Sequence, residues 1–216
     1  ADRMLDMGFQ PIIDEICKFL PAKRQTLLFS ATFPGDIERL SKRLMKRPVR
    51  VEVDSEHDMT SIRQILYEIP DKGARSTALL AVLQRHQPVS ALVFCQTKVL
   101  TEEIAAVLRD QGYMALAING DLDQKDRESR LVQFTNKSLT VLVATDVAAR
   151  GLDIDSLDLV INYHLTKDPE VHTHRIGRTG RAGSTGLACS LYHSSEAYKL
   201  ELIEGFTGQF LEPEPM

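Results

Sequence analysis

The sequence has no tryptophan, only 6% aromatic residues and three cysteines among 216 residues. An odd number of cysteines without CxxC spacing argues against a disulfide framework or a zinc site and favours a reducing, cytoplasmic compartment. No apolar run approaches the roughly 20 residues that a membrane-spanning helix needs, and the first residues lack the pattern of a signal peptide. With 43% apolar and 26% charged residues, the composition predicts a globular protein with a substantial core and no membrane partner.

Two further absences bear on function. No GxxxxGK[ST] phosphate loop occurs, and "KGARST" has the residue types of that loop in another order. No Asp or Glu occurs from Val171 to Ser195, although the net charge is −4. That stretch contains "HRIGRTGRAG", in which Arg175, Arg178 and Arg181 are three residues apart. Guanidinium groups match phosphate oxygens, so Arg178 and Arg181 could grip one polyanion, with a basic, solvated loop as an equal alternative.

Short apolar, β-rich runs alternate with segments of helical periodicity. Strands covered on both faces are predicted over 26–32, 91–97, 140–145, 158–163 and 186–192. A further strand is predicted at "VRVEV" (49–53), and helices over 35–47, 99–112 and 120–134, the last with Asp121 and Gln124 in capping-box spacing. This alternation predicts an α/β fold built on a parallel β-sheet flanked by helices on both faces.

Polar residues follow several of the predicted strands. Ser30–Thr32 comes after one strand, Gln96–Thr97 after another and Thr145–Asp146 after a third. Ligands of parallel α/β sheets bind beyond the carboxyl ends of the strands, so we expect a binding site there. The arginines of "HRIGRTGRAG" follow the strand at 158–163 through the turn "LTKDP".

Two other motifs contain residues suited to nucleotides or phosphate. In "ATDVAARGLDI", Gly151 would permit a tight turn and Asp153 would accept a hydrogen bond from a ribose hydroxyl, while Asp146 and Asp153 are alternatively helix caps. In "GDLDQKDR", Arg127 lies near a helix start, where the helix dipole and the cation both favour phosphate, unless the segment is merely a capped surface helix. Without a phosphate loop, the rest of any NTP site must lie elsewhere.

Together these pieces resemble the DEAD-box RNA helicases, and the resemblance covers nearly the whole chain. "ADRMLDMGF" is similar to the sequence that follows the DEAD box, with Ala1 and Asp2 as its last two letters. "SAT", "LVFCQT", "GDLDQKDR", "ATDVAARGLDI" and "HRIGRTGR" then occur in the family's order and at its spacing. "DPEVHTHRIGRT" and "LQRHQPVSALVFCQT" are most similar to a bacterial branch that acts on ribosomal RNA.

The resemblance implies a RecA-like fold and a division of the chain. Its expected parts are the end of a first RecA-like domain (1–54), a linker (55–63), a second RecA-like domain (64–208) and a tail (209–216). The chain is therefore expected to be a fragment, with the phosphate loop and the acids of the DEAD box in a missing first domain. The segment "TLLFS" would expose apolar surface unless it pairs with something.

The resemblance also assigns roles to individual positions. By motif match, ATP would meet Gly151, Asp153, Arg178 and Arg181; the RNA backbone would meet Thr97, Gly120, Arg127 and Thr145; and Asp2, Ser30, Thr32 and His174 would link hydrolysis to domain closure. Gln96 stands where many family members have Asn, which leaves the RNA contact at that position open. No metal ligand is assigned within this chain.

The implied function is that of an ATP-dependent RNA helicase that unwinds short RNA duplexes or remodels RNA–protein complexes, in ribosome assembly. Its cofactors would be ATP and Mg²⁺, with the magnesium ligands mostly in the first RecA-like domain, and its partners RNA and that domain. This chain alone is expected to be inactive. Two alternatives stay open: a non-enzymatic RNA-binding or protein-docking module, and a helicase of the wider superfamily that acts on DNA.

Overall fold

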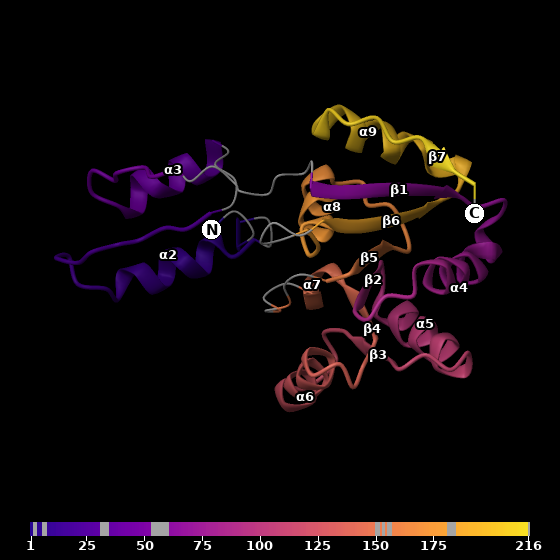
Figure 1. Ribbon diagram of the computed structural model, residues 1–216. Coiled ribbons are helices and arrows are strands. Elements are labelled where there is room, and N and C mark those ends of the chain that lie inside the picture. Colours follow the sequence, from indigo (N-terminus) through magenta and orange to yellow (C-terminus); the bar gives the residue numbers. More distant parts are fainter. Residues whose placement is uncertain are drawn as a thin grey trace. The chain divides into compact units, whose positions relative to one another are not determined.

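The computed structural model divides the chain into two compact units, Ala1–Asp54 and Ser55–Met216. It describes residues 1, 4–5, 8–30, 35–52, 61–149, 152, 154, 157–180 and 185–215. The second unit contains the sheet, and the first contains two helices with extended segments beside them (Figure 1).

The second unit is built on a seven-stranded sheet in which every pair of neighbouring strands is parallel (Figure 1). Its strands are β1 (Ile62–Glu68), β2 (Ala91–Cys95), β3 (Ala115–Ile118), β4 (Val141–Thr145), β5 (Leu159–Asn162), β6 (Gly186–Tyr192) and β7 (Pro213–Glu214). Their order is β3-β4-β2-β5-β6-β1-β7. The predicted parallel α/β sheet is confirmed, and β2, β4, β5 and β6 fall within four of the predicted ranges. Strands β1, β3 and β7 were not predicted, and β7 lies in the stretch expected to be a tail.

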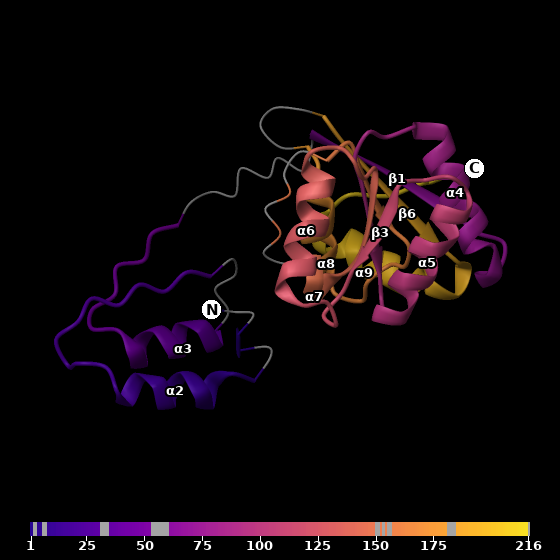
Figure 2. The same cartoon turned by 90° about the horizontal axis from the view of Figure 1, so that it is seen from below.

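Helices cover both faces of this sheet, as Figure 2 shows from below. The helices are α4 (Arg75–His86), α5 (Lys98–Asp110), α6 (Gln124–Thr135), α7 (Asp146–Ala149), α8 (Pro169–Ile176) and α9 (Ala197–Thr207). Side chains of α4 and α5 share one apolar cluster with alternate residues of the strands. Side chains of α6, α7 and α8 share a second cluster with the intervening residues, and α9 packs on Leu66 of the same face. Strands β2 and β5 are buried along their whole lengths, and their sequences are apolar except for Asn162 at the end of β5.

The start of α6 differs from the prediction by two residues. Asp123, not Asp121, is the N-cap, and its Oδ1 accepts a hydrogen bond from the amide of Asp126 at 2.7 Å. The carboxylate of Asp121 instead forms an ion pair with Lys98. The predicted capping-box pairing of Asp121 with Gln124 is therefore wrong, because the turn after β3 is two residues longer and the helix begins at Gln124.

The first unit contains α2 (Gln10–Lys18) and α3 (Gly35–Leu44), which an ion pair between Arg43 and Asp14 connects at 2.7 Å. The predicted strands at 26–32 and 49–53 are not strands over their described residues, and Leu27, Phe29, Val49 and Val51 are 68%, 80%, 85% and 78% exposed. A strand requires a neighbour for its backbone groups and cover for its side chains. No described segment of this unit provides either, so the apolar sequence alone does not produce a sheet.

Gly180 begins the connection from α8 to β6 in the left-handed region, with φ of +69°. A Cβ at this position would lie 2.7 Å from Cγ1 of Ile62 at the start of β1. The preceding residue, Thr179, forms a bridge with Leu157 before β5 and donates its hydroxyl to the Leu157 carbonyl. Both backbone conformation and close packing therefore require glycine at position 180.

We expect Gly180→Ala to lower the free energy of unfolding of the second unit by about 2–4 kcal/mol, the sum of left-handed strain and overpacking. Gly112→Ala is the matched control, because Gly112 has φ of +85° but no atom near an added Cβ. That control should lose only the strain, about 1–2 kcal/mol. Denaturant unfolding of the two variants measures both values, and equal losses would refute the packing argument.

Candidate functional site

Three predicted site residues lie at the carboxyl ends of adjacent strands. Thr145 is the last residue of β4, Thr97 follows β2 and Gly120 follows β3, and these three strands are neighbours in the order β3-β4-β2. Thr97 and Gly120 are exposed, and Thr145 is half-buried. Thr97 is also the N-cap of α5, since its Oγ1 accepts a hydrogen bond from the amide of Leu100 at 3.2 Å. The structure thus brings Thr97, Gly120 and Thr145 to one edge of the sheet.

The turn around Gly120 is held by side chains that the sequence did not single out. The side-chain amide of Asn119 donates to Thr101 Oγ1 at 3.2 Å and to Glu102 Oε1 at 3.0 Å, and its oxygen accepts from the amide of Asp121 at 3.0 Å. Lys98 pairs with Asp121 across the exposed surface of this turn. Consequently the backbone at Gly120 is presented at the edge of the sheet by a fixed turn.

Arg127 lies in the first turns of α6, and the structure connects it to α7. Its Nη2 donates to the carbonyl of Ala148 at 2.8 Å. Because α7 begins directly after Thr145, the guanidinium of Arg127 belongs to the same edge as the Thr145 site. The arrangement places a cation beside the exposed backbone and hydroxyl groups of that edge.

The first of the three evenly spaced arginines, Arg175, is buried and ion-paired within the second unit. Arg175 is only 3% exposed, and its Nε and Nη2 donate to Asp146 Oδ1 and Oδ2 at 2.6 and 2.9 Å. Its Nη1 donates to Asn162 Oδ1 at 3.1 Å and to the carbonyl of His164 at 2.9 Å. Arg175 was not one of the two arginines predicted to grip a polyanion, and these contacts give it a structural role. Asp146 was predicted to be either part of a nucleotide or phosphate site or a helix cap. In the structure its carboxylate binds Arg175.

Arg178 lies at the opposite edge of the sheet from Thr97 and Thr145. Helix α8 follows β5 and carries the chain back, so that the carbonyl of Arg178 accepts a hydrogen bond from the amide of Leu157 at 3.1 Å, before β5 begins. The half-buried side chain donates from Nη1 to the carbonyl of Leu152 at 3.3 Å. The expectation that the arginines simply follow the strand at 158–163 missed this crossover, because α8 was not predicted.

The remaining predicted site residues divide into two groups. His174 is exposed in the last turn of α8, and Ser30 is half-buried in the first unit. The predicted positions Asp2, Thr32, Gly151, Asp153 and Arg181 lie outside the described residues. The edge with Thr97, Gly120, Arg127 and Thr145, and the turn with Arg178, are therefore the parts of the predicted site whose geometry is defined.

Comparison with known protein families gives two matches. Residues 74–183 match the helicase conserved C-terminal domain, and residues 1–40 match the DEAD/DEAH box helicase family. The chain is 51% identical over 94% of its length to the ATP-dependent RNA helicase DbpA of Escherichia coli, and 44% identical over 98% to the DEAD-box ATP-dependent RNA helicase CshA of Geobacillus kaustophilus. The chain belongs to the DEAD-box family of ATP-dependent RNA helicases.

Solved structures of this family share the fold. A DEAD box protein from Methanococcus jannaschii is 40% identical with a TM-score of 0.67, over 100% of this chain and 58% of that one. Saccharomyces cerevisiae Dbp5 bound to RNA and ADP BeF3 is 29% identical with a TM-score of 0.87, over 100% of this chain and 57% of that one. The fold of the DEAD-box chain is thus RecA-like. The chain spans 44% and 45% of the lengths of the DbpA and CshA relatives.

Several classes of site are absent from the described part of this DEAD-box chain. There, no three His, Cys, Asp or Glu side chains gather closely enough to hold a metal ion. Every helix described is too short or too polar to cross a bilayer. Cys17, Cys95 and Cys189 are free thiols, and burial raises the pKa of Cys95 and of Cys189 to about 12. The buried cysteines are consequently inert core residues rather than nucleophiles.

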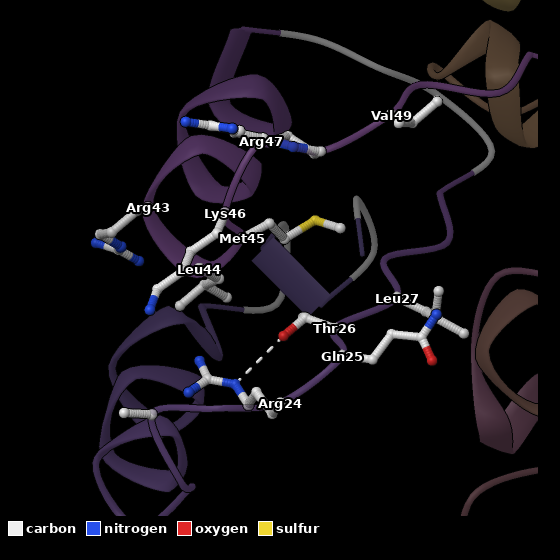
Figure 3. A pocket seen from close by; sticks show the side chains of 12 residues that line it. Arg24, Gln25, Thr26, Leu27, Arg43, Leu44, Met45, Lys46, Arg47 and Val49 are labelled. Atoms are coloured by element: carbon white, nitrogen blue, oxygen red, sulfur yellow. Dashed lines mark hydrogen bonds between the residues drawn. The ribbon is translucent and has the colours of Figure 1, made fainter.

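The first unit of the DEAD-box chain has a hollow that the sequence did not predict. Its volume is about 560 Å³, and Figure 3 shows the side chains that line it. Arg24, Arg43, Lys46 and Arg47 make the lining basic, and Arg24 donates to Thr26 Oγ1 at 3.2 Å. Leu27 and Val49, both exposed, belong to the same lining. The hollow lies between α3 and extended segments that have no described strand beside them, and it contains none of the predicted site residues.

Helix α8 also carries a buried histidine that fixes it to β1. His172 is fully buried, and its Nε2 lies 2.9 Å from Gln64 Oε1 while Gln64 Nε2 donates to Gln209 Oε1 at 2.6 Å. Because Gln64 Oε1 can only accept, Nε2 of His172 must carry the proton. Its Nδ1 is buried and has no hydrogen-bond partner among the described residues. Burial, and then the charge of Arg175, lower the pKa of His172 to about 4.

The buried histidines predict that stability falls in mild acid. Unfolded histidine takes up a proton below about pH 6.5, whereas folded His172, with a pKa of about 4, stays neutral until lower pH. Between those values the unfolded state binds more protons, so the folded state loses stability as the pH falls. For His172 the loss at pH 5 is about 2 kcal/mol. Burial lowers the pKa of His164 to about 4 as well, which adds to the same slope.

Thermal unfolding of the chain and of His172→Gln at pH 7.5 and pH 5.0 checks this expectation. The variant should lose less stability than the parent between the two pH values, by about 2 kcal/mol. Any loss of packing in the variant appears at both pH values and cancels in the difference. Parallel pH profiles for the two proteins would contradict the assignment of a neutral buried imidazole.

Proposed function

We propose that the chain is part of an ATP-dependent RNA helicase and contributes half of its RNA-binding surface and an arginine for its ATP site. The observation that carries this proposal is that two sets of predicted site residues lie at opposite edges of one sheet. Thr97, Gly120 and Thr145 lie at the carboxyl ends of three adjacent strands, and Arg178 lies at the opposite edge. One unit of this kind can bind RNA at one edge while its other edge meets a nucleotide held by another domain.

The proposed RNA contacts are to the backbone rather than to the bases. Thr97 and Gly120 expose a hydroxyl and a main-chain segment, and the cation of Arg127 lies at the same edge. Groups of this kind bind phosphates and sugars, which position nucleic acid without reading its sequence. The chain therefore binds single-stranded RNA of any sequence, and ATP-driven closure against another domain unwinds short duplexes or remodels RNA–protein complexes.

The proposed nucleotide contact is an arginine finger from Arg178, with Arg181 as its partner. The fit rests on Arg178 itself, because its guanidinium is half-buried and is held in place by the carbonyl of Leu152. A guanidinium in a fixed position stabilises the charge that develops on transferring phosphate. In the same proposal Gly151 and Asp153 meet the ribose, and His174, Asp2, Ser30 and Thr32 link hydrolysis to closure.

The first RecA-like domain supplies the phosphate loop and the ligands of Mg²⁺ in this proposal. The described residues of this chain do not fit a magnesium site, because they contain no cluster of acids or histidines. Bound Mg²⁺ would neutralise the phosphate charge, and the contribution of this chain to the phosphates would be the guanidinium of its arginine finger.

The proposed setting is cytoplasmic, which the free cysteines support. The proposed substrate is ribosomal RNA during ribosome assembly, supported by the likeness of two stretches to the branch of DbpA.

Arg178→Ala in the complete helicase should lower kcat for RNA-stimulated ATP hydrolysis by at least about 10²-fold, less than the roughly 10³–10⁵-fold of a single arginine finger because Arg181 shares the role. Arg178→Lys should rescue poorly, because a point charge does not reproduce the bidentate fork. The measurement is kcat at saturating ATP and RNA. Wild-type kcat in the alanine variant would refute the role of Arg178.

Two controls accompany this measurement. Thermal unfolding of the 216-residue chain with Arg178→Ala shows whether the change merely destabilises the second unit; a collapsed midpoint without a kinetic defect would point to a structural loop. The unmodified chain should show no RNA-stimulated ATPase by itself, because it has no phosphate loop. Robust turnover by the purified chain would overturn the division of the ATP site between two domains.

Arg127→Ala should weaken RNA binding by the chain about equally for all sequences and make the salt dependence shallower by about 0.7 in log–log slope. Arg109→Ala is the matched control, because Arg109 also donates to a backbone carbonyl, that of Ala115, but at the start of β3 on the other edge. Titration of fluorescent single-stranded RNAs of several sequences over a range of salt measures both. Equal effects of the two substitutions, or loss for only one sequence, would contradict backbone binding at the Arg127 edge. Equal affinity for DNA and RNA would favour a superfamily helicase that acts on DNA.

A further inference from the structure

The ion pair between the buried Arg175 and the half-buried Asp146 lies at the carboxyl edge of the sheet, while the backbone of Arg175 adjoins the turn with Arg178. Arg175 binds both carboxylate oxygens of Asp146, at 2.6 and 2.9 Å, and its guanidinium carbon lies 5.1 Å from the centre of the Phe94 ring. With Nη1 on Asn162 and on the carbonyl of His164, every nitrogen of the guanidinium has a partner. These bonds use four of the five N–H donors, and the side chain is only 3% exposed, so Arg175 is poorly placed to bind a phosphate and we look for its role in its pair with Asp146.

Asp146 connects this pair to the RNA edge. It directly follows Thr145 and is the first residue of α7. Helix α7 has four residues, and a helix of one turn has almost no stability of its own, so its orientation depends on contacts with other elements. Two such contacts are the pair with Arg175 and the hydrogen bond of 2.8 Å from Arg127 to the carbonyl of Ala148. Movement of Thr145 or Arg127 on binding RNA is therefore transmitted to Asp146.

Arg175 connects the pair to the ATP edge. It lies in the last turn of α8, and its carbonyl accepts a hydrogen bond from the amide of Arg178 at 3.2 Å. Long side chains of a helix point back towards its N-terminus. The guanidinium of Arg175 can thus reach the carboxyl ends of β4 and β5 while its backbone adjoins the turn that carries Arg178. Arg175 thus contacts the carboxyl ends of β4 and β5 through its side chain and the Arg178 turn through its backbone.

We propose that Asp146 and Arg175 are positioning residues through which RNA bound at the carboxyl edge and ATP bound at Arg178 strengthen each other's binding. This inference rests on the proposed helicase function. A planar guanidinium held by two bonds to one carboxylate permits few relative orientations of α7 and α8. The two helices therefore move as one body, and coupling between two sites is reciprocal.

The chain contains a matched control for the loss of a buried ion pair. Arg75, like Arg175, is 3% exposed, and it pairs with Glu196, which is 8% exposed. Arg75 also donates to the carbonyls of Tyr163 and Leu191 at 2.6 and 2.8 Å. It contacts neither α7 nor the turn with Arg178 in any hydrogen bond of the described residues. Arg75→Lys and Glu196→Gln should therefore cost stability without affecting communication between the edges.

The experiment uses the complete helicase. It measures the dissociation constant of a nonhydrolysable ATP analogue with and without saturating single-stranded RNA, and the dissociation constant of RNA with and without the analogue. The coupling is the ratio of the two dissociation constants of either ligand. Variants are Asp146→Asn, Arg175→Lys, the double variant, and the two controls. Typical couplings between sites are about 5–150-fold. We expect the coupling of the parent to fall about 10-fold or to disappear in Asp146→Asn and in Arg175→Lys. The double variant should be no worse than either single one, because the pair acts as a unit.

Three outcomes would overturn the inference. Coupling retained in Asp146→Asn and in Arg175→Lys, with thermal midpoints lowered as in the Arg75 and Glu196 controls, would show a purely structural ion pair. RNA affinity lost equally with and without the analogue would make Asp146 part of the RNA site itself. Coupling lost in the controls as well would mean that any loss of stability breaks communication. Failure of the parent to bind RNA or the analogue would instead refute the proposed function. This result differs from the three above, so failure of the proposed function and failure of the coupling inference can be told apart.

Discussion

The parallel pairing of the strands is the constraint on which the site depends. Parallel strands end at the same edge of a sheet, so Thr97, Gly120 and Thr145 meet although 48 positions separate the first from the last in the sequence. Parallel pairing also requires each connection to return the chain to the opposite edge. Helix α8 is such a return, and it places Arg178 beside Leu157 rather than beside Thr145. The two-edged arrangement of the second unit is therefore a consequence of its topology.

Cationic side chains complete the carboxyl edge of this sheet. The strand ends leave carbonyl groups without a neighbouring strand, and buried carbonyls need donors. Arg75 donates to Tyr163 and Leu191, Arg175 to His164, and Lys199 to Leu165 at 3.0 Å. Burial alone would raise the pKa of Glu196, but hydrogen bonds from Lys199 and Arg75 lower it to about 2, so the carboxylate stays charged and pairs with both cations. Charges of this kind hold the edge in one shape. Burial is the largest cause of the lowered pKa of His164, and the positive charges of Arg75, Lys199 and Arg175 lower it further.

The first unit shows the opposite situation. Its helices α2 and α3 contact through Arg43 and Asp14, but its extended segments leave Leu27, Phe29, Val49 and Val51 exposed. Continuous apolar sequence is a property of strands that are covered on both faces, and it stabilises a sheet only where the cover is present. The same reasoning explains why "ALVFC" forms the inner strand β2, with β4 and β5 beside it, while "TLLFS" does not form a strand.

The sequence by itself determined the alternation of strands and helices, the parallel α/β class and the family, because these follow from local periodicity and from the order of short motifs. Strands β2, β4, β5 and β6 were predictable since each lies in a mostly apolar run, whereas the apolar run of β1 is interrupted by Arg63 and Gln64 and β3 is a short strand of four residues. Asp123 rather than Asp121 caps α6, a choice between two aspartates that depends on where the turn after β3 ends. Motif match assigned Arg178 and not Arg175 to ATP, but only the tertiary structure showed that Arg175 is buried and paired with Asp146. Identical side chains one helical turn apart differ in burial and partners, and those depend on residues such as Asp146 and Asn162 that the fold brings from elsewhere in the chain.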